Sequence, residues 1–301
     1  MNGKRNSSIK MGRSNTALSV VCYVITGMFT VMCIFPFILV VTSSLMTEKE
    51  ILSEGYKLVP DRWTFAAYEY LFTKSSDLIN AYGTTIFITL VGTLSGLLIM
   101  SMAGYVLNRK DFAIREKLSF FIYFTTLFSG GLIPTYILYV RYLGLKDNLL
   151  AIILPCMVSA WSIFLMRNFM KSIPDELYES AMIDGAGNFT IYRKIFMPLA
   201  GPSLATIGLF LALGYWNEWY NASLYIETSS KYPLQYFLQR MLNQAASVDK
   251  LSNSGHAIDV VAPTQSVKMA AAVLTTGPII LLYPFLQRYF VSGITIGSVK
   301  G

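Results

Sequence analysis

The sequence predicts an all-α membrane protein with six transmembrane helices and a polar helix-turn-helix loop that projects into water. Of the 301 residues, 54% are hydrophobic and only 14% are charged, whereas soluble domains carry about 25% charged residues. Apolar runs recur along the chain, and most reach the roughly 20 residues that a helix needs to cross a bilayer. Between the fourth and fifth runs lies a charged stretch whose side chains are too costly to bury in hydrocarbon.

Six apolar runs are candidates for membrane spans. The first contains no charged residue and is too long for the core of a signal peptide, so we expect a retained helix. Gly92, Gly96 and Gly104 in the second run suit close helix packing. Pro155 predicts a kink in the short fourth run, and Glu218 makes the fifth less regular. The predicted spans cover residues 17–41, 81–107, 118–140, 149–166, 203–226 and 268–290.

Basic residues predict the orientation of these spans. The amino-terminal tail and the loop after the second span each carry four Lys or Arg residues, whereas the loop between the third and fourth spans carries only Arg141 and Lys146. Because cytoplasmic loops carry the excess of basic residues, we expect both termini and the loop at 167–202 inside, and the loops at 48–78 and 227–267 outside. The predicted domains are a cytoplasmic tail (1–16), a transmembrane domain (17–290) containing the charged loop (172–202), and a cytoplasmic carboxy-terminal tail (291–301).

The charged loop is typical of a short amphipathic helix. Ser172, Pro174 and Asp175 indicate its start, because Ser can cap a helix, Pro is tolerated in the first turn and acidic residues complement the helix dipole. Asp184 and Gly185 predict its end, with Gly as a left-handed C-cap. At helical spacing, Leu177, Tyr178, Ala181 and Met182 share one face, while Glu176, Glu179 and Ser180 lie mostly on the other.

This helix has two interpretations. It docks in a groove of another protein, or it lies on the membrane surface. Membrane-surface helices favour Lys and Arg on their polar face, whereas this polar face is acidic, so we favour docking. A second short helix is expected at 189–196, ended by Pro198.

The same residues carry a family resemblance. The run Glu179-x-Ala181-x-x-Asp184-Gly185-Ala186, followed by Ile195-x-x-Pro198, resembles the EAA loop of the membrane-spanning permease subunits of binding-protein-dependent ABC importers. It departs from that pattern at Ser180, where Ala is usual. Flanking features are similar to the carbohydrate-uptake subclass, above all to the smaller permease of maltose-type systems and to polysaccharide permeases of Gram-positive bacteria. These features are Pro60-x-x-x-Thr64, Trp216-Asn217-Glu218, and Gln287-Arg288-Tyr289-Phe290 leading to Gly293, Gly297, Lys300 and Gly301.

The resemblance implies a sugar or oligosaccharide transporter in the bacterial cytoplasmic (inner) membrane. Its implied partners are a second homologous permease, two ATP-binding subunits that bind ATP and Mg²⁺, and an extracellular or lipoprotein solute-binding protein that delivers the carbohydrate. The tail at 291–301 would reach into the ATPase dimer. The expected ATPase-coupling residues are Glu179, Ala181, Asp184, Gly185 and Ala186, together with Leu177 and Met182.

Other chemistry has little support in the sequence. No Gly-x-x-x-x-Gly-Lys-Ser/Thr loop is present to cradle nucleotide phosphates. A lone histidine, His256, and three scattered cysteines indicate no metal or catalytic site. Basic residues lie at span ends instead of forming a cluster, so the net charge of +7 does not indicate nucleic-acid binding. We therefore expect no catalytic residue, metal or cofactor in this chain.

Glu218 is the one carboxylate within the six apolar runs. A charged residue in a span is a functional candidate, but the aromatic residues around Glu218 also fit an interfacial belt, which we favour slightly. If the site faces the pathway, Glu218 and Asn217 would hydrogen-bond sugar hydroxyls, and Trp216 or Tyr215 would stack on a sugar ring.

Three other functions stay open at this point. A secondary transporter would need a coupling-ion site of buried carboxylates, which the sequence largely lacks. An importer permease for a non-carbohydrate solute would carry the same loop. A membrane scaffold would recruit a soluble partner without transport, and substrate-dependent ATP hydrolysis in a reconstituted complex separates it from a transporter.

Overall fold

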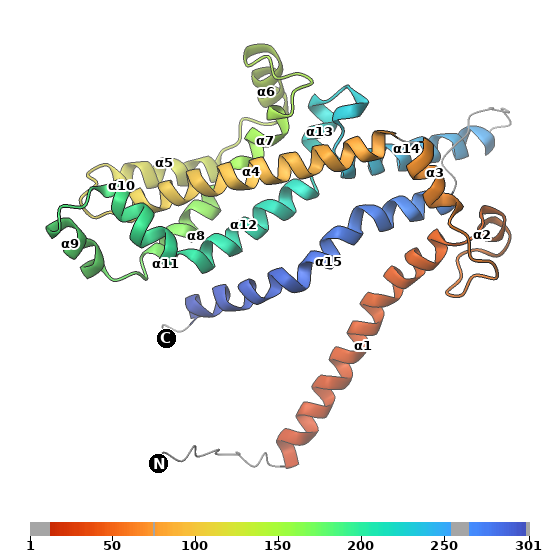
Figure 1. The fold of residues 1–301 in the computed structure, drawn as a ribbon, viewed down its shortest axis with the longest axis horizontal. Helices are drawn as coiled ribbons and strands as arrows, with labels where there is room; N and C mark the ends of the chain where they lie inside the picture. Colours follow the sequence, from red (N-terminus) through yellow and green to blue (C-terminus); the bar gives the residue numbers. More distant parts are fainter. Residues whose placement is uncertain (1–12, 75, 254–264, 299–301) are drawn as a thin grey trace. The chain divides into compact units, whose positions relative to one another are not determined.

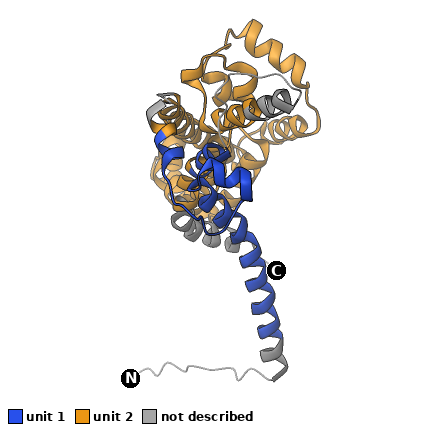
Figure 2. Ribbon diagram, turned by 90° about the vertical axis from the view of Figure 1, so that its right-hand side faces the viewer, with its two compact units in different colours: residues 1–69, 264–273 blue, residues 70–263, 274–301 orange. Residues whose placement is uncertain are grey.

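The computed structural model describes residues 13–74, 76–253 and 265–298, and every regular element in these ranges is a helix (Figure 1). The all-α prediction is confirmed. The chain forms two compact units, shown in Figure 2: residues 1–69 with 264–273, and residues 70–263 with 274–301.

The first unit combines a long apolar helix with a folded loop. Helix α1 (Arg13–Ser44) contains the stretch Leu18–Ser44, which is long and apolar enough to cross a membrane. Its side chains are largely exposed, and only those at its carboxy-terminal end, such as Ser43 and Ser44, are buried. Its exposed apolar side chains, such as Tyr23 and Met32, suit contact with lipid. The loop that follows holds α2 (Glu48–Glu54) and the start of α3 (Ala66–Lys74).

Two glutamate carboxylates hold this loop in place. The Glu50 carboxylate accepts a hydrogen bond from the Asp61 backbone N–H at 2.7 Å. The Glu48 carboxylate accepts from the N–H groups of Gln265 and Ser266 at 2.9 and 3.0 Å. Because Gln265 begins α15 (Gln265–Ser298), Glu48 satisfies backbone donors that the first turn of that helix leaves unpaired.

The second unit is built around α4 (Ser76–Asn108), a continuous helix of 33 residues. A Cβ on any of its glycines at 92, 96 and 104 would come within 3.0 Å of a neighbouring helix, so the predicted close packing is confirmed. Figure 1 shows α5 and α8 running beside α4, and α12 crosses it closely. These helices are α5 (Arg115–Leu127), α7 (Leu150–Met157), α8 (Ala160–Met170) and α12 (Gly201–Trp216).

The third predicted span, 118–140, is wrong as a single helix. It divides into α5 and a second helical segment (Leu132–Tyr142), which meet at 112°. Gly131 has φ +85° between them, a conformation that a continuous α-helix excludes. The second segment comprises α6 (Leu132–Ile137) and the π-helical turn η1 (Leu138–Tyr142).

The fourth and fifth predicted spans are also interrupted. The predicted bend in the fourth is confirmed, since α7 and α8 meet at 48°, but it lies after Pro155, at Val158 and Ser159, whose backbone is extended. The fifth, 203–226, is wrong as one helix, because α12 ends at Trp216 and α13 (Tyr220–Tyr225) begins separately. The described residues thus hold two helices that could cross a membrane alone, or five spans if each bent pair counts as one.

Short helices occupy the two ends of the second unit (Figure 1). At one end, the chain stays helical through Pro198 to Leu199, so the predicted helix end before Pro198 is wrong. A proline in the first turn of α11 needs no N–H partner, and an 80° bend leads into α12. The elements at this end are α9 (Asp175–Ile183), α10 (Asn188–Ile191), η2 (Tyr192–Phe196) and α11 (Met197–Leu199); at the other end lie α13, η3 (Ser229–Lys231) and α14 (Leu234–Asn253).

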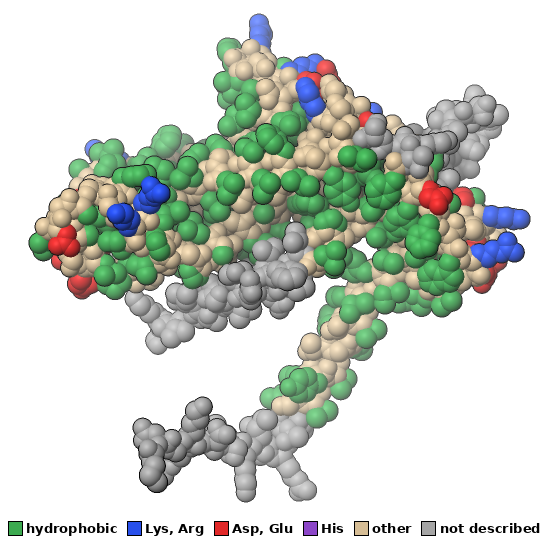
Figure 3. Space-filling model, in the orientation of Figure 1, with side chains coloured by type: hydrophobic (Ala, Val, Ile, Leu, Met, Phe, Trp, Pro, Cys, Tyr) green, Lys and Arg blue, Asp and Glu red, His purple; other side chains and the backbone are tan. Residues whose placement is uncertain are grey.

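Helix α15 continues to Ser298, so most of the predicted tail at 291–301 is helical. His256, residues 1–12 and residues 299–301 lie outside the described residues. In the view of Figure 3, hydrophobic side chains cover the sides of the second unit, and acidic and basic side chains gather at the end that carries α9. This distribution fits a unit whose sides lie in lipid and whose ends lie in water.

Candidate functional site

Helix α9 lies at one end of the second unit, near α10 (Figure 1). Pro174 occupies its N-cap position, whereas the Ser172 hydroxyl donates to the Phe169 carbonyl at 2.6 Å. Ser172 therefore ends the preceding helix instead of capping α9. Asp175 and Glu176 lie in the first turn, where carboxylates complement the helix dipole.

The end of α9 is a Schellman turn. Gly185 has φ +79°, the Ala186 N–H donates to the Ala181 carbonyl at 2.9 Å, and the Gly185 N–H donates to the Met182 carbonyl at 3.0 Å. These two bonds satisfy carbonyls that the last turn would leave unpaired. The predicted left-handed C-cap at Gly185 is confirmed, and no atom lies within 4 Å of a Cβ built there. The conformation of Gly185, not a close approach within the chain, requires glycine.

One face of α9 packs into the core of the second unit. Ala181 is buried, and Tyr178 and Ala186 are partly buried against the same cluster, which includes Ile191 and Tyr192. Burial of this face fixes the rotation of α9 about its axis. The opposite face is therefore presented outward in a defined orientation. The predicted shared face is wrong for Leu177 and Met182, which are exposed and do not join the buried cluster of Tyr178 and Ala181.

The outward face of α9 and the turn after it combine acidic and apolar side chains, and we call this surface the α9 face. Among the residues that the structure describes, the carboxylates of Glu176, Glu179 and Asp184 have no hydrogen-bond or ion-pair partner. Two apolar members, Ile183 and Phe189, are 86% and 64% exposed. Both are more exposed than Leu177 and Met182, the apolar residues that the sequence predicted as contacts of the ATPase. The α9 face consists of Glu176, Leu177, Glu179, Ser180, Met182, Ile183, Asp184 and Phe189.

Ile183 and Phe189 were not selected from the sequence. Helical spacing assigns faces relative to the helix axis, but Ile183 is the last residue of α9 and Phe189 lies beyond the turn. Their exposure depends on the path of the chain through Gly185. An apolar residue directly before the Asp-Gly helix stop was the available signal for Ile183.

The loop after α4 holds α9 in place. The guanidinium carbon of Arg109 lies 3.0 Å from the centre of the Tyr178 ring, and Arg109 also bonds Asp111 at 2.7 Å. This bond lowers the pKa of Asp111. Lys110 forms an ion pair with Asp175 at 2.5 Å, which raises the pKa of Lys110.

The predicted pathway residues on α12 make contacts within the second unit. Tyr215 is fully buried, and its hydroxyl donates to the Ile153 carbonyl at 2.7 Å. The indole N–H of Trp216 donates to the Thr275 carbonyl at 3.2 Å. These contacts hold α12 against α7 and α15.

Asn217 and Glu218 lie in the turn between α12 and α13. The Asn217 amide donates to the Leu213 carbonyl at 2.8 Å. The Glu218 carboxylate accepts from the Asn221 N–H at 2.7 Å and from the Cys156 thiol at 3.4 Å. Glu218 thus satisfies a donor at the start of α13, as a structural residue would, and the contact of these side chains with a sugar stays a prediction.

A second polar cluster, which sequence reasoning missed, joins two loops at the opposite end of the unit. Asp147 has φ +55°. Its carboxylate accepts from the N–H groups of Glu227 and Thr228 at 3.1 and 3.0 Å and pairs with Lys231 at 2.7 Å. The hydrogen bond from Lys231, followed by those from Thr228, holds the pKa of Asp147 well below its usual range. No sequence pattern distinguishes this aspartate from other loop acids.

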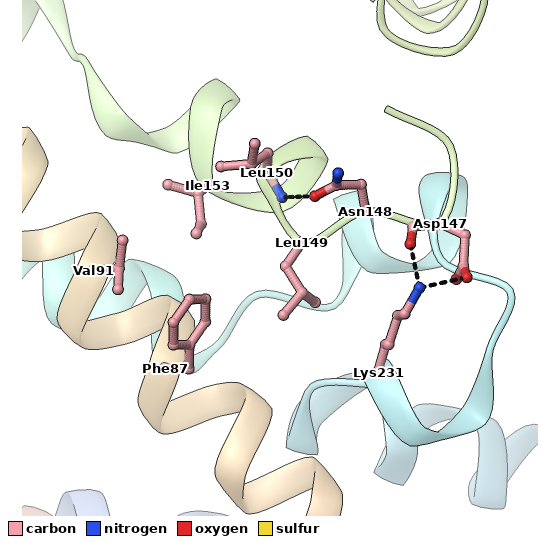
Figure 4. Close-up of a pocket in the computed structure, with 8 residues that line it drawn as sticks. All are labelled: Phe87, Val91, Asp147, Asn148, Leu149, Leu150, Ile153 and Lys231. Carbon is pink, nitrogen blue, oxygen red and sulfur yellow. Dashed lines mark hydrogen bonds and ion pairs between the residues drawn. The ribbon is translucent and has the colours of Figure 1, made fainter. Parts of the chain in front are cut away.

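The Asp147–Lys231 pair lines a cavity of about 410 Å³ (Figure 4). The remaining lining is largely apolar and includes Phe87 and Val91 of α4. Because Asp147 and Lys231 pair with each other, the cavity has few free polar groups that could bind a ligand. The described residues contain no group of three or more His, Cys, Asp or Glu side chains that could hold a metal ion.

Known proteins are similar to this chain over most of its length. Residues 9–296 match the family model described as "Binding-protein-dependent transport system inner membrane component". The polygalacturonan/rhamnogalacturonan transport system permease protein YtcP of Bacillus subtilis is 38% identical, over 95% of this chain and 99% of that protein. The arabinooligosaccharides transport system permease protein AraQ of Halalkalibacterium halodurans is 29% identical, over 89% of this chain and 91% of that protein.

A solved structure is similar in fold as well. One chain of a bacterial ABC transporter involved in the import of the acidic polysaccharide alginate superposes with a TM-score of 0.81. It is 29% identical in sequence, and the match covers 93% of this chain and 99% of that chain.

Proposed function

Since this chain belongs to the family of binding-protein-dependent transport system inner membrane components, we propose that it forms half of a translocation pathway for an oligosaccharide and couples to an ATPase through α9. It is a multi-pass permease subunit of the inner membrane and is not itself catalytic. ATP and Mg²⁺ are bound by the partner ATPase subunits.

The observation that supports this proposal most strongly is the two-sided environment of α9. Its inner face is fixed in the core, while the α9 face carries carboxylates without partners in the described chain and exposed apolar groups. A partner with an apolar groove bordered by Lys or Arg would complement both. We assign this groove to the ATPase. Glu179, Asp184, Leu177 and Met182 contact it, while Ala181, Gly185 and Ala186 shape the turn that presents them.

The remaining assembly follows from the size of the subunit. One subunit of this kind supplies one wall of a pore, so a second homologous permease completes it, with one ATPase below each. Both termini and α9 lie in the cytoplasm, and a solute-binding protein docks on the loops at 48–78 and 227–267. Movement of the ATPases shifts α9 and biases the pathway between inward-open and outward-open states.

The named relatives support a carbohydrate substrate. Two of them concern acidic polymers, polygalacturonan or rhamnogalacturonan and alginate, and one concerns arabinooligosaccharides. We propose that this chain transports oligosaccharides derived from such polymers, and oligogalacturonates are the first probe.

Reconstitution tests the proposed function. The complex that co-purifies with this chain is placed in proteoliposomes so that the ATPases face the lumen. ATP is enclosed in the lumen, and the binding protein is added outside. We expect oligogalacturonate uptake that requires ATP and is accompanied by ATP hydrolysis. Uptake that proceeds without ATP and stops when ionophores collapse the ion gradients would indicate a secondary transporter instead.

A further inference from the structure

We infer that Arg109 and Tyr178 form a clamp that transmits movement of α9 to α4, and that both are positioning residues for ATP-driven transport. The inference rests on the proposed docking of an ATPase on α9. Arg109 directly follows the last residue of α4, and Tyr178 lies in the middle of α9. With the guanidinium carbon 3.0 Å from the ring centre, the pair is a cation–π contact between the two elements.

The Arg109–Tyr178 contact is more buried than the adjacent ion pair between Lys110 and Asp175. The Arg109 side chain is 14% exposed, whereas the Lys110 and Asp175 side chains of the adjacent ion pair are 77% and 58% exposed. Exposed ion pairs contribute little because water and salt screen them, while cation–π contacts strengthen as they are desolvated. The Arg109–Tyr178 contact, and not the Lys110–Asp175 pair, therefore holds α9 to the end of α4.

A second connection runs through Asn188, the first residue of α10. The Tyr178 hydroxyl donates to the Asn188 side-chain oxygen at 3.1 Å, and the Tyr105 hydroxyl of α4 donates to the Asn188 carbonyl at 3.3 Å. The Tyr105 ring packs against Tyr192 and Phe196, with ring centres 5.4 and 4.9 Å apart. The end of α4 is thus joined to α9, α10 and η2 by one aromatic cluster.

The opposite end of α4 contacts the start of α14. The Thr85 hydroxyl oxygen accepts a hydrogen bond from the Leu234 N–H at 2.8 Å, and this contact is buried. Helix α4 has 33 residues and is about 50 Å long at 1.5 Å per residue. Rigid elements and packed side chains carry coupling between distant sites, so a displacement of α9 that moves α4 also reaches α14.

The test measures the number of oligogalacturonate molecules taken up per ATP hydrolysed by the reconstituted complex. Tyr178→Leu and Arg109→Gln are each expected to lower this ratio about threefold to tenfold, the range for loss of a partly desolvated cation–π contact. The double variant is expected to be no worse than the stronger single variant, because both changes remove one contact. Tyr178→Phe keeps the ring and removes only the exposed hydrogen bond to Asn188, so it is expected to stay near the wild-type ratio, as is the control Lys110→Gln.

Each outcome has a defined meaning. A purely structural defect lowers uptake and hydrolysis together and leaves their ratio unchanged, and that result would overturn the clamp. Multiplicative effects in the double variant, or loss of the co-purifying ATPase from Tyr178→Leu, would overturn it as well. Absence of a co-purifying ATPase from the wild-type complex would instead refute the proposed docking on which the inference rests.

Discussion

Replacement of Gly185 by valine is expected to lower uptake about tenfold or more while leaving the protein in the membrane. The Schellman turn places Gly185 at φ +79°, and holding a residue with a side chain in such a conformation costs of order 1–3 kcal/mol. A β-branched residue is especially unfavourable there. Because the turn orients Asp184 and the chain leading to Phe189, its distortion would misplace the α9 face. Uptake and the amount of co-purifying ATPase are the measurements.

Gly185→Asn is the matched control. Asparagine enters the left-handed region more readily than other non-glycine residues, and a Cβ at this position meets no atom of the chain within 4 Å. We therefore expect Gly185→Asn to retain much of the wild-type uptake. If it is as inactive as the valine variant, the backbone conformation is not the requirement, and a close approach of the ATPase to Gly185 becomes the better explanation.

Glu179→Lys is expected to separate ATP hydrolysis from uptake. Glu179 is exposed and forms no hydrogen bond or ion pair with a described residue, so in the complex its carboxylate is free to pair with Lys or Arg of the ATPase. An exposed pair contributes only about 0–1 kcal/mol, but a charge buried at an interface without its partner costs several kcal/mol. The reversal places like charges together, and uptake should fall roughly tenfold or more for an interface that desolvates them.

Two further measurements complete this prediction. Glu116→Lys makes the same charge change at the start of α5, on a side chain that is 84% exposed and does not belong to the α9 face, and it should leave uptake unchanged. A basic-to-acidic change at the facing ATPase position should partly restore uptake in Glu179→Lys. Normal uptake by Glu179→Lys at ordinary salt would mean that the residue faces solvent in the complex, and Leu177 and Met182 would become the better contacts.

The sequence predicted the features that depend on local chemistry. The end of α9 follows from Asp184 and Gly185, because the left-handed C-cap strongly favours glycine. Pro155 correctly predicted a bend in the fourth span, but α7 continues past Pro155, and the break lies at Val158 and Ser159, whose backbone is extended. The turn at Gly185 could be located from the sequence because the permissive backbone of glycine does not depend on distant contacts.

The breaks in the third and fifth spans were not predicted. Apolar composition reports the cost of placing side chains in water, but it does not report whether backbone hydrogen bonds continue. Gly130 and Gly131 interrupt the ladder within an otherwise apolar run, and the chain resumes as α6 at 112° to α5. Glu218 marked the fifth span as irregular, yet its role at the start of α13 became clear only from the structure.

Contacts between segments that are distant in sequence were not predicted either. Arg109 and Tyr178 are far apart in sequence, and so are Asp147 and Lys231. Each of these residues is an ordinary loop or helix residue by its local pattern. Their pairing depends on packing around α4, which no periodicity within one element encodes.

Photocrosslinking from Ile183 tests the central claim, that α9 docks on an ATPase, most directly. Ile183, the last residue of α9, is 86% exposed. The control position is Phe128, which caps the carboxy-terminal end of α5 and is 65% exposed. With benzoylphenylalanine in place of each residue in turn, irradiation of the assembled complex should join Ile183, but not Phe128, to the ATP-binding subunit. Crosslinks from Ile183 only to lipid or to other membrane subunits, in a complex that contains the ATPase, would contradict the account.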